Sequence, residues 1–126
     1  MEAFKNLIVW QKSMELVRVV YQLSKGFPPD ERYALTDQLR RAVVSIPSNI
    51  AEGNGRASNK DYAHFFAIAR GSLYETLTQI QVAEDLGYIG KHDALDQLAA
   101  DVGRMLTSLL KKYGAIHSTA TPTRYT

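Results

Sequence analysis

Hydrophobic residues recur at intervals of three and four over most of the chain, which is the spacing of residues on one face of an α-helix. Glycine, proline and short polar stretches separate four such segments. No segment shows the strict hydrophobic-polar alternation that indicates a β-strand. The pattern predicts four helices, over about residues 7–25, 30–53, 58–86 and 91–113.

Short connections between these segments predict that successive helices run antiparallel. The expected fold class is all-α, an up-down-up-down four-helix bundle formed by residues 1–114. Residues 115–126 are rich in serine, threonine and proline and lack periodicity, so we expect a flexible C-terminal tail. The length of 126 residues, with 45% hydrophobic and 22% charged residues, is typical of one globular domain.

The second predicted helix carries the most information. Pro47 lies inside its hydrophobic pattern and should kink the helix, because proline lacks the backbone donor of a regular turn. Asp30 is expected to cap its N-terminus. Gly53 and Gly55 are expected to end it with the left-handed backbone angles that glycine adopts readily.

A polar stripe follows the same helix beside the proline. We interpret it as a structural seam against the third helix, in which Arg41 faces inward and pairs with a buried Glu75. The alternative is that Glu75 faces the solvent. The expected seam consists of Arg41, Ser45, Asn49, Glu52 and Glu75.

The first predicted helix has two hydrophobic stripes, more than one face of a bundle helix requires. Val9 and Val20 belong to the second stripe. This stripe either flanks the same core or forms an interface between subunits, because exposed hydrophobic patches often mark such interfaces.

Composition argues against several classes of enzyme. The chain has no cysteine, which excludes disulfides, thiol catalysis and cysteine-ligated zinc. Its three histidines, His64, His92 and His117, lie on different elements, and the Glu-x-x-His motif of di-metal bundles is absent. The serines lack a neighbouring histidine or a nucleophile-elbow pattern. We therefore predict a protein that is not an enzyme and uses no metal or cofactor.

The sequence also argues against secretion and membrane insertion. Its first residues lack the basic and hydrophobic segments of a secretory signal. No hydrophobic run approaches the length of a membrane span. We expect a cytoplasmic protein without a membrane partner.

The net charge of +2 is unevenly distributed. Residues 32–70 carry +3, residues 71–101 carry −5, and residues 102–126 carry +4. This distribution either gives a basic face for RNA or DNA or is an ordinary solvated helix surface. We expect Arg40 to point outward, unlike its neighbour Arg41. The candidate nucleic-acid-binding residues are Arg40, Arg56, Lys60 and Arg70.

Several motifs together point to a known family. The most specific is the run Ser-Ile-Pro-Ser-Asn-Ile-Ala-Glu-Gly at residues 45–53. The others lie within residues 7–11, 27–35, 38–42, 68–75 and 86–88, and at Arg56. With these motifs the chain resembles the bacterial four-helix-bundle proteins found in intervening sequences of 23S rRNA genes. That family is related to the accessory protein of diversity-generating retroelements.

The resemblance implies an antiparallel four-helix bundle that assembles as a ring-like homopentamer. It also implies a basic surface that engages nucleic acid and, by analogy with the retroelement relatives, a reverse transcriptase partner. No enzymatic activity is established for the group. The expected function is a homo-oligomeric bundle that binds structured RNA or DNA. The alternative is a protein-interaction adaptor that does not bind nucleic acid.

Overall fold

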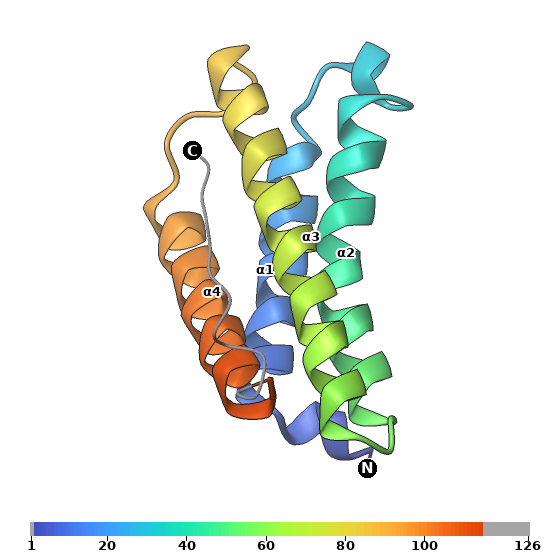
Figure 1. Ribbon diagram of the computed structural model, residues 1–126. Helices are drawn as coiled ribbons and strands as arrows, with labels where there is room; N and C mark the ends of the chain where they lie inside the picture. Colours follow the sequence, from blue (N-terminus) through green and yellow to red (C-terminus); the bar gives the residue numbers. More distant parts are fainter. Residues whose placement is uncertain (1, 115–126) are drawn as a thin grey trace, which may run out of the picture.

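The computed structural model describes residues 2–114, and within them the chain forms four α-helices and no strand. The helices are α1 (Ile8–Ser24), α2 (Leu35–Asn54), α3 (Asn59–Asp85) and α4 (Asp93–Tyr113). Two short 3₁₀ helices, η1 (Ala3–Asn6) and η2 (Pro29–Glu31), precede α1 and α2. Successive helices run in opposite directions (Figure 1). The predicted all-α fold is confirmed, and the tail at residues 115–126 lies outside the described residues.

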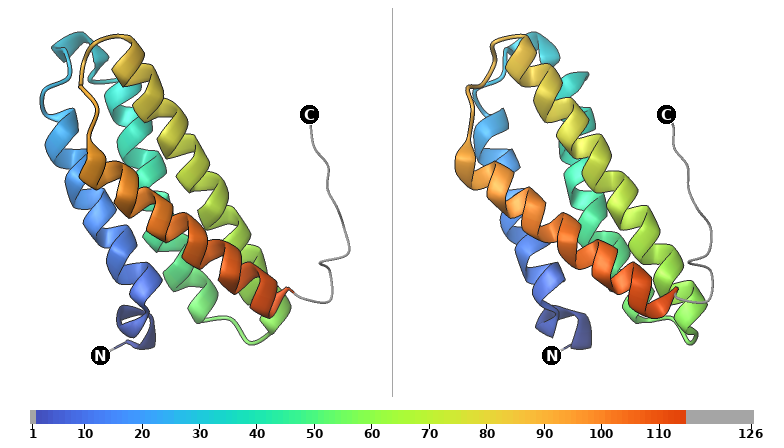
Figure 2. Two further views of the ribbon diagram at one scale, coloured as in Figure 1. Left: turned by 90° about the vertical axis from the view of Figure 1, so that its left-hand side faces the viewer. Right: turned by 60° about the vertical axis from the view of Figure 1, so that its left-hand side comes forward.

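Each helix packs against two neighbours, which closes the bundle. α2 contacts α1 and α3, whereas α4 contacts α3 and α1. Figure 2 shows α4 flanked by α1 on one side and α3 on the other. The start of α3 and the end of α4 therefore lie at the same end of the molecule.

The core is formed by the hydrophobic faces that the periodicity predicts. Phe66, Leu39 and Ile46 are completely buried. Val9 and Val20 on the second stripe of α1 belong to the same core, with 3% and 0% of their surface exposed. For these two residues the structure supports a single core, whereas Ile8, from the same stripe, is 57% exposed.

The start of α2 differs from the prediction. The helix begins at Leu35, and Asp30 lies in η2 instead of capping α2. The Leu35 backbone N–H donates to the Glu31 carboxylate at 3.3 Å. Glu31 therefore satisfies one of the backbone donors that the start of a helix leaves free. α2 then continues through Pro47 to Asn54, and the bend at Pro47 stays a prediction.

Side chains of the preceding residues cap the N-termini of α3 and α4. The Ser58 hydroxyl accepts the backbone N–H of Asp61 at 3.1 Å. At α4, the His92 ring accepts the N–H of Leu95 through Nδ1 at 3.0 Å. His92 therefore has a structural role that the sequence did not reveal.

The glycines of the second helix do not have the predicted left-handed angles. In residues 2–114 only Gly87 has a positive φ, of 78°, and it ends α3. Gly53 is needed for a different reason, because a Cβ at this position would lie 2.7 Å from the Cβ of Phe65. The end of α2 and the start of α3 thus approach too closely for a side chain.

Tyr88 ties the loop after α3 to the segment before α2. Its hydroxyl donates to the Glu31 carboxylate at 2.7 Å, and its ring lies 5.6 Å from that of Phe27. The hydrogen bond to Glu31 is the main reason why the pKa of Tyr88 is raised above the usual value. The same carboxylate caps α2, so Glu31 connects three segments at this end of the bundle.

The raised pKa of Tyr88 predicts a pH-dependent contribution to stability. A group whose pKa is higher in the folded state stabilises fully below its unfolded value, about 10 for tyrosine, and less as the pH rises through its folded pKa. The Tyr88→Phe variant should be less stable than the wild type at neutral pH, with a gap that narrows in alkali. Urea unfolding across this range measures the gap. Tyr33→Phe is the control, since Tyr33 is 83% exposed, and an equal gap for it would contradict the prediction.

None of the helices in the described part of the chain has a stretch long and apolar enough to cross a membrane.

Candidate nucleic-acid interface

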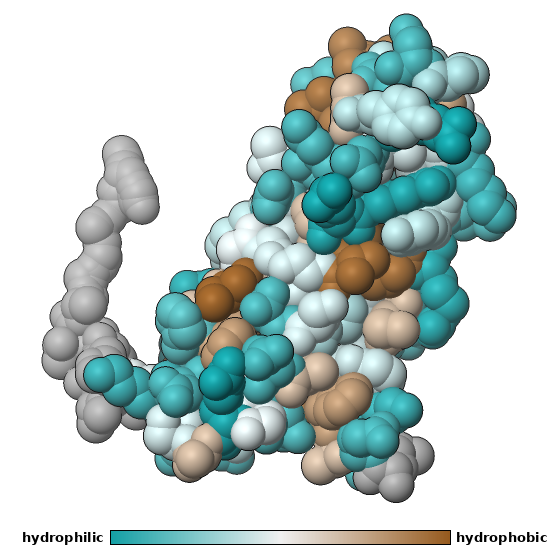
Figure 3. All heavy atoms as spheres, turned by 90° about the vertical axis from the view of Figure 1, so that its right-hand side faces the viewer, coloured by the Kyte–Doolittle hydropathy of each residue, from teal (hydrophilic) through white to brown (hydrophobic). Residues whose placement is uncertain are grey.

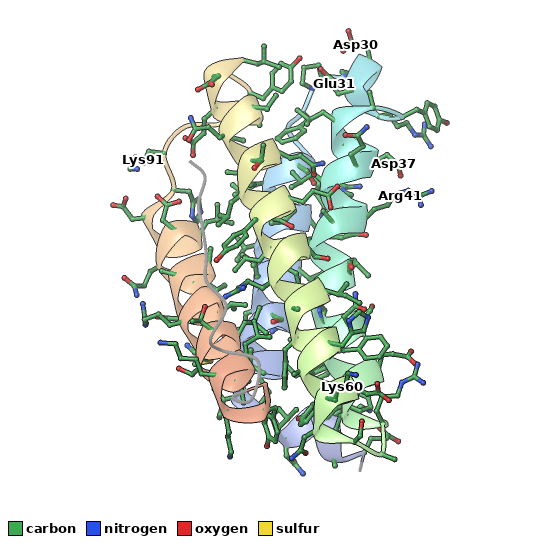
Figure 4. The ribbon with its side chains drawn as sticks, in the orientation of Figure 1. Asp30, Glu31, Asp37, Arg41, Lys60 and Lys91 are labelled. Carbon is green, nitrogen blue, oxygen red and sulfur yellow. The ribbon has the colours of Figure 1, made fainter. Side chains whose placement is uncertain are left out.

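A basic groove lies between the first half of α3 and the last half of α4. Its volume is about 660 Å³. Four side chains with basic groups line it: Lys60, His64, Arg70 and Lys111. Figure 4 places Lys60 near the N-terminal end of α3. The lining residues, all within the described chain, include no carboxylate.

The groove follows from helical spacing and antiparallel packing. Lys60 and His64 are four residues apart and therefore lie on one face of α3, as do Thr107 and Lys111 on α4. On the neighbouring face of α3, Phe66 and Ala69 are buried in the core. The basic residues are thus left at the rim, where the two helices meet solvent.

Arg70 bridges α3 and α4 at the end of the groove that is farther from Lys60. Its Nη1 donates to the Thr107 hydroxyl on α4 at 3.4 Å. This long hydrogen bond uses one of five guanidinium donors, so most of the Arg70 fork is available to a ligand. Lys60 and Lys111 are exposed, and neither forms an ion pair with another residue in the described region. Neighbouring like charges without acidic partners produce a positive potential that favours a bound anion.

Of the four predicted nucleic-acid-binding residues, Lys60 and Arg70 share this groove, whereas Arg40 lies elsewhere. Arg40 does not point outward as predicted. Its Nε donates to the Ser24 hydroxyl at 2.8 Å, and its guanidinium lies 4.7 Å from the ring centre of Tyr21. These contacts use Arg40 to join α2 to the end of α1.

Arg56 lies in the loop between α2 and α3. It pairs with Glu52 at 2.7 Å and stacks on Phe65 at 4.9 Å. Glu52 neutralises its charge, so Arg56 contributes less positive potential than Lys60 or Lys111.

The predicted polar seam is smaller than expected. The Ser45 and Ser72 hydroxyls lie 2.8 Å apart across α2 and α3, and the Asn49 amide donates to the Ser45 hydroxyl at 2.9 Å. Arg41 and Glu75 do not meet, and both are exposed. The polar contact between α2 and α3 is therefore made by small hydroxyl groups and one amide in place of an ion pair.

Arg41 points away from the bundle (Figure 4). It pairs with Asp37, one turn earlier on α2, at 3.1 Å. The orientations predicted for Arg40 and Arg41 are therefore reversed. Glu52 is also exposed, so three of the five predicted seam residues face the solvent.

Sequence reasoning missed Lys111 and His64 as part of the basic groove. The positive charge of residues 102–126 was a usable signal for Lys111. In an antiparallel bundle, the end of the fourth helix lies beside the start of the third, where Lys60 and His64 are found. Within residues 2–114 there is no cluster of three or more potential metal ligands.

Comparison with known proteins places the chain in a family. The family model described as 23S rRNA-intervening sequence protein matches residues 5–108. No match is found among curated proteins. A similar solved structure is a protein with unknown function from the S23 ribosomal protein family of Bacteroides thetaiotaomicron. It has a TM-score of 0.75 and 22% identity, and the match covers 82% of this chain and 99% of that chain.

This structural likeness shows a common fold. The family match extends over most of the bundle and includes all the motifs found within residues 7–88. The chain belongs to the 23S rRNA-intervening sequence protein family.

Proposed function

We propose that this protein is a non-enzymatic, homo-oligomeric bundle that binds structured RNA or DNA through the basic groove between α3 and α4. The observation that supports nucleic-acid binding is the convergence of Lys60, Arg70 and Lys111 on one groove without a carboxylate in its lining. Arginine can donate two parallel hydrogen bonds to a phosphate, and lysine supplies a compact point charge. Such contacts bind the backbone of a nucleic acid without reading its sequence.

A salt titration tests nucleic-acid binding. Replacing Lys60, Arg70 and Lys111 by alanine together should weaken binding roughly a hundredfold at about 0.15 M salt, because three phosphate contacts no longer release counterions. The slope of log affinity against log salt should become shallower by about 2 to 3. Fluorescence polarisation with labelled RNA and DNA at several salt concentrations measures both quantities.

The control for this titration is Lys25→Ala combined with Arg18→Ala and Lys5→Ala. These exposed residues lie outside the groove, so their loss removes the same charge without a predicted phosphate contact. Equal weakening by both triple variants would contradict a defined site. Absent or salt-insensitive binding would favour the protein-interaction adaptor.

A specific surface supports that alternative. A largely apolar cavity of about 540 Å³ lies between the start of α1 and α4, next to Ile8, which is 57% exposed. Such a surface fits a protein partner. The family resemblance suggests a reverse transcriptase, which co-purification from a strain that carries both genes would test.

Self-association is part of the proposal and rests on the family resemblance and on the face shared by α1 and α2. A groove of about 330 Å³ lies there, lined mainly by apolar side chains that include Trp10, Met14 and Val44. Figure 3 shows the side of the molecule that carries α2, where apolar patches are separated by hydrophilic side chains. Val44 is 38% exposed on α2.

Light scattering coupled to size-exclusion chromatography should give the mass of a pentamer in place of the 14.1 kDa of a single chain. Val44→Glu should dissociate the assembly, since a charge would be desolvated in the contact. Val82→Glu is the matched control, because Val82 is 40% exposed on α3 and lies outside this groove. A wild type with the mass of one chain would refute self-association.

A further inference from the structure

The basic groove continues beyond Arg70 along the same two helices. A second cavity of about 540 Å³ lies next to it, and Thr107 lines both cavities. The second cavity is lined mainly by apolar and small residues such as Leu73 and Leu77, and its charged lining residues are Asp96 and Arg104. The two cavities adjoin at Thr107, so the surface between α3 and α4 is basic near Lys60 and mainly apolar farther along.

A tyrosine lies at the edge of the apolar part. Tyr74 on α3 lines the second cavity, and 54% of its surface is exposed. Arg104, on the opposite helix, lines the same cavity; 67% of its side chain is exposed, and its guanidinium pairs with Asp101. The exposed part of the Tyr74 ring offers a surface on which a base can stack, whereas the Asp101 carboxylate offsets the charge of Arg104.

From this arrangement we propose that the groove between α3 and α4 binds unpaired nucleotides, with phosphates at Lys60, Arg70 and Lys111 and a base stacked on Tyr74. The inference rests on the proposed function and narrows it to single-stranded segments, including the loops of a structured RNA. Single-stranded binding sites commonly combine a positive groove that follows the backbone with an aromatic side chain under a base.

A duplex does not fit this arrangement equally well. In a duplex the bases stack on one another and expose only their edges, so Tyr74 could stack on none of them. A duplex could reach the basic rim through its phosphates but would leave the apolar part of the groove unused. An unpaired strand can place its phosphates against the basic residues and one of its bases against Tyr74 at the same time.

The length of the groove limits how many nucleotides it holds. Lys60 and Tyr74 are separated by about 21 Å along α3 at roughly 1.5 Å per residue. This distance corresponds to about six stacked nucleotides at roughly 3.4 Å each. Asp96 lines the far end of the second cavity and pairs with Lys91 at 3.4 Å. Its carboxylate disfavours a further phosphate there.

Fluorescence polarisation with labelled oligonucleotides of about a dozen residues tests the proposal. RNA and DNA single strands are compared with the same strands annealed to their complements. We expect tighter binding of the single strands. Tyr74→Ala should weaken single-strand binding roughly 5- to 150-fold and leave duplex binding unchanged, whereas Tyr74→Phe should retain the wild-type affinity.

The matched control is Tyr33→Ala. Tyr33 is also exposed and lies next to an arginine, Arg32, but outside both cavities. A thermal melt of each variant shows whether it is folded. Tighter binding of the duplex, or a loss on Tyr74→Ala no larger than that of Tyr33→Ala, would overturn the inference.

These results are separable from a failure of the proposed function. If neither form of nucleic acid binds, the proposed function fails and the inference fails with it. If binding depends on salt and on Lys60, Arg70 and Lys111 but not on Tyr74, only the inference is refuted. The single strand that binds more tightly, RNA or DNA, shows which nucleic acid the groove prefers.

Discussion

Replacing Phe66 by alanine is expected to lower the free energy of unfolding by about 3–5 kcal/mol, the largest effect of any single change proposed for this protein. Phe66 is completely buried, and its ring lies 4.4 Å from Tyr62 and 6.1 Å from Tyr113. The variant loses the burial of a large side chain, leaves a cavity and breaks an aromatic stack. Chemical denaturation followed by circular dichroism measures the loss.

Phe66→Leu is the companion variant, and it should cost only about 1–1.5 kcal/mol because most of the volume is kept. If Phe66→Ala costs no more than Phe66→Leu, the site is not tightly packed. The result also bears on function. Tyr113 lies in the last turn of α4, two residues after Lys111, so the stack holds in place the end of α4 that carries one side of the basic groove.

Gly53→Ala is expected to destabilise the bundle by about 1–3 kcal/mol through overpacking. The added Cβ would lie 2.7 Å from the Cβ of Phe65 and 3.3 Å from a ring carbon of Tyr62. A Cβ is fixed to the backbone, so α2 and α3 would have to move apart. This cost exceeds the gain of at most about 1 kcal/mol from the higher helix propensity of alanine.

Gly71→Ala is the matched control, and we expect it to change the free energy of unfolding in the opposite direction. Gly71 lies inside α3, and a Cβ there would meet nothing within 4 Å. Alanine should therefore stabilise the protein by about 0.5–1 kcal/mol. Both variants are measured by the same denaturation experiment. If the two substitutions shift stability in the same direction, the close approach at Gly53 does not determine its effect.

The helices could be predicted from sequence because each buries one face, and burial dictates the spacing of hydrophobic residues. The prediction for residues 58–86 differs from the observed Asn59–Asp85 by one residue at each end. The start of α2 was less predictable. Asp30 is a good capping residue, but the two preceding prolines begin a 3₁₀ turn, and Glu31 then provides the cap.

The orientation of individual polar side chains could not be predicted in the same way. Helical geometry places Arg40 and Arg41 about 100° apart, but it does not say which of them faces α1. The partners of Arg40, Ser24 and Tyr21, come from another helix. Likewise, helical spacing allows Arg41 and Glu75 to face each other. In the structure both are exposed, and the Ser45 and Ser72 hydroxyls make the polar contact between α2 and α3.

The candidate site was predicted only in part because it depends on contacts between distant segments. Lys60 and Arg70 were selected for their charge, together with Arg40 and Arg56. Charge along the sequence does not distinguish an arginine that joins two helices from one that lines an open groove. The contribution of Lys111 requires the antiparallel packing of α3 and α4.

The arrangement of charge along α3 and α4 also affects the orientation in which the protein meets a charged ligand. Both helices carry lysines at one end of the bundle, whereas Glu84, Asp85, Asp93 and Asp96 lie at the other. These charges of α3 and α4 therefore form an electric dipole roughly parallel to the two helices. A polyanion that diffuses toward it experiences a torque before any contact forms, which turns the lysine-bearing end toward it and raises the rate of productive encounters.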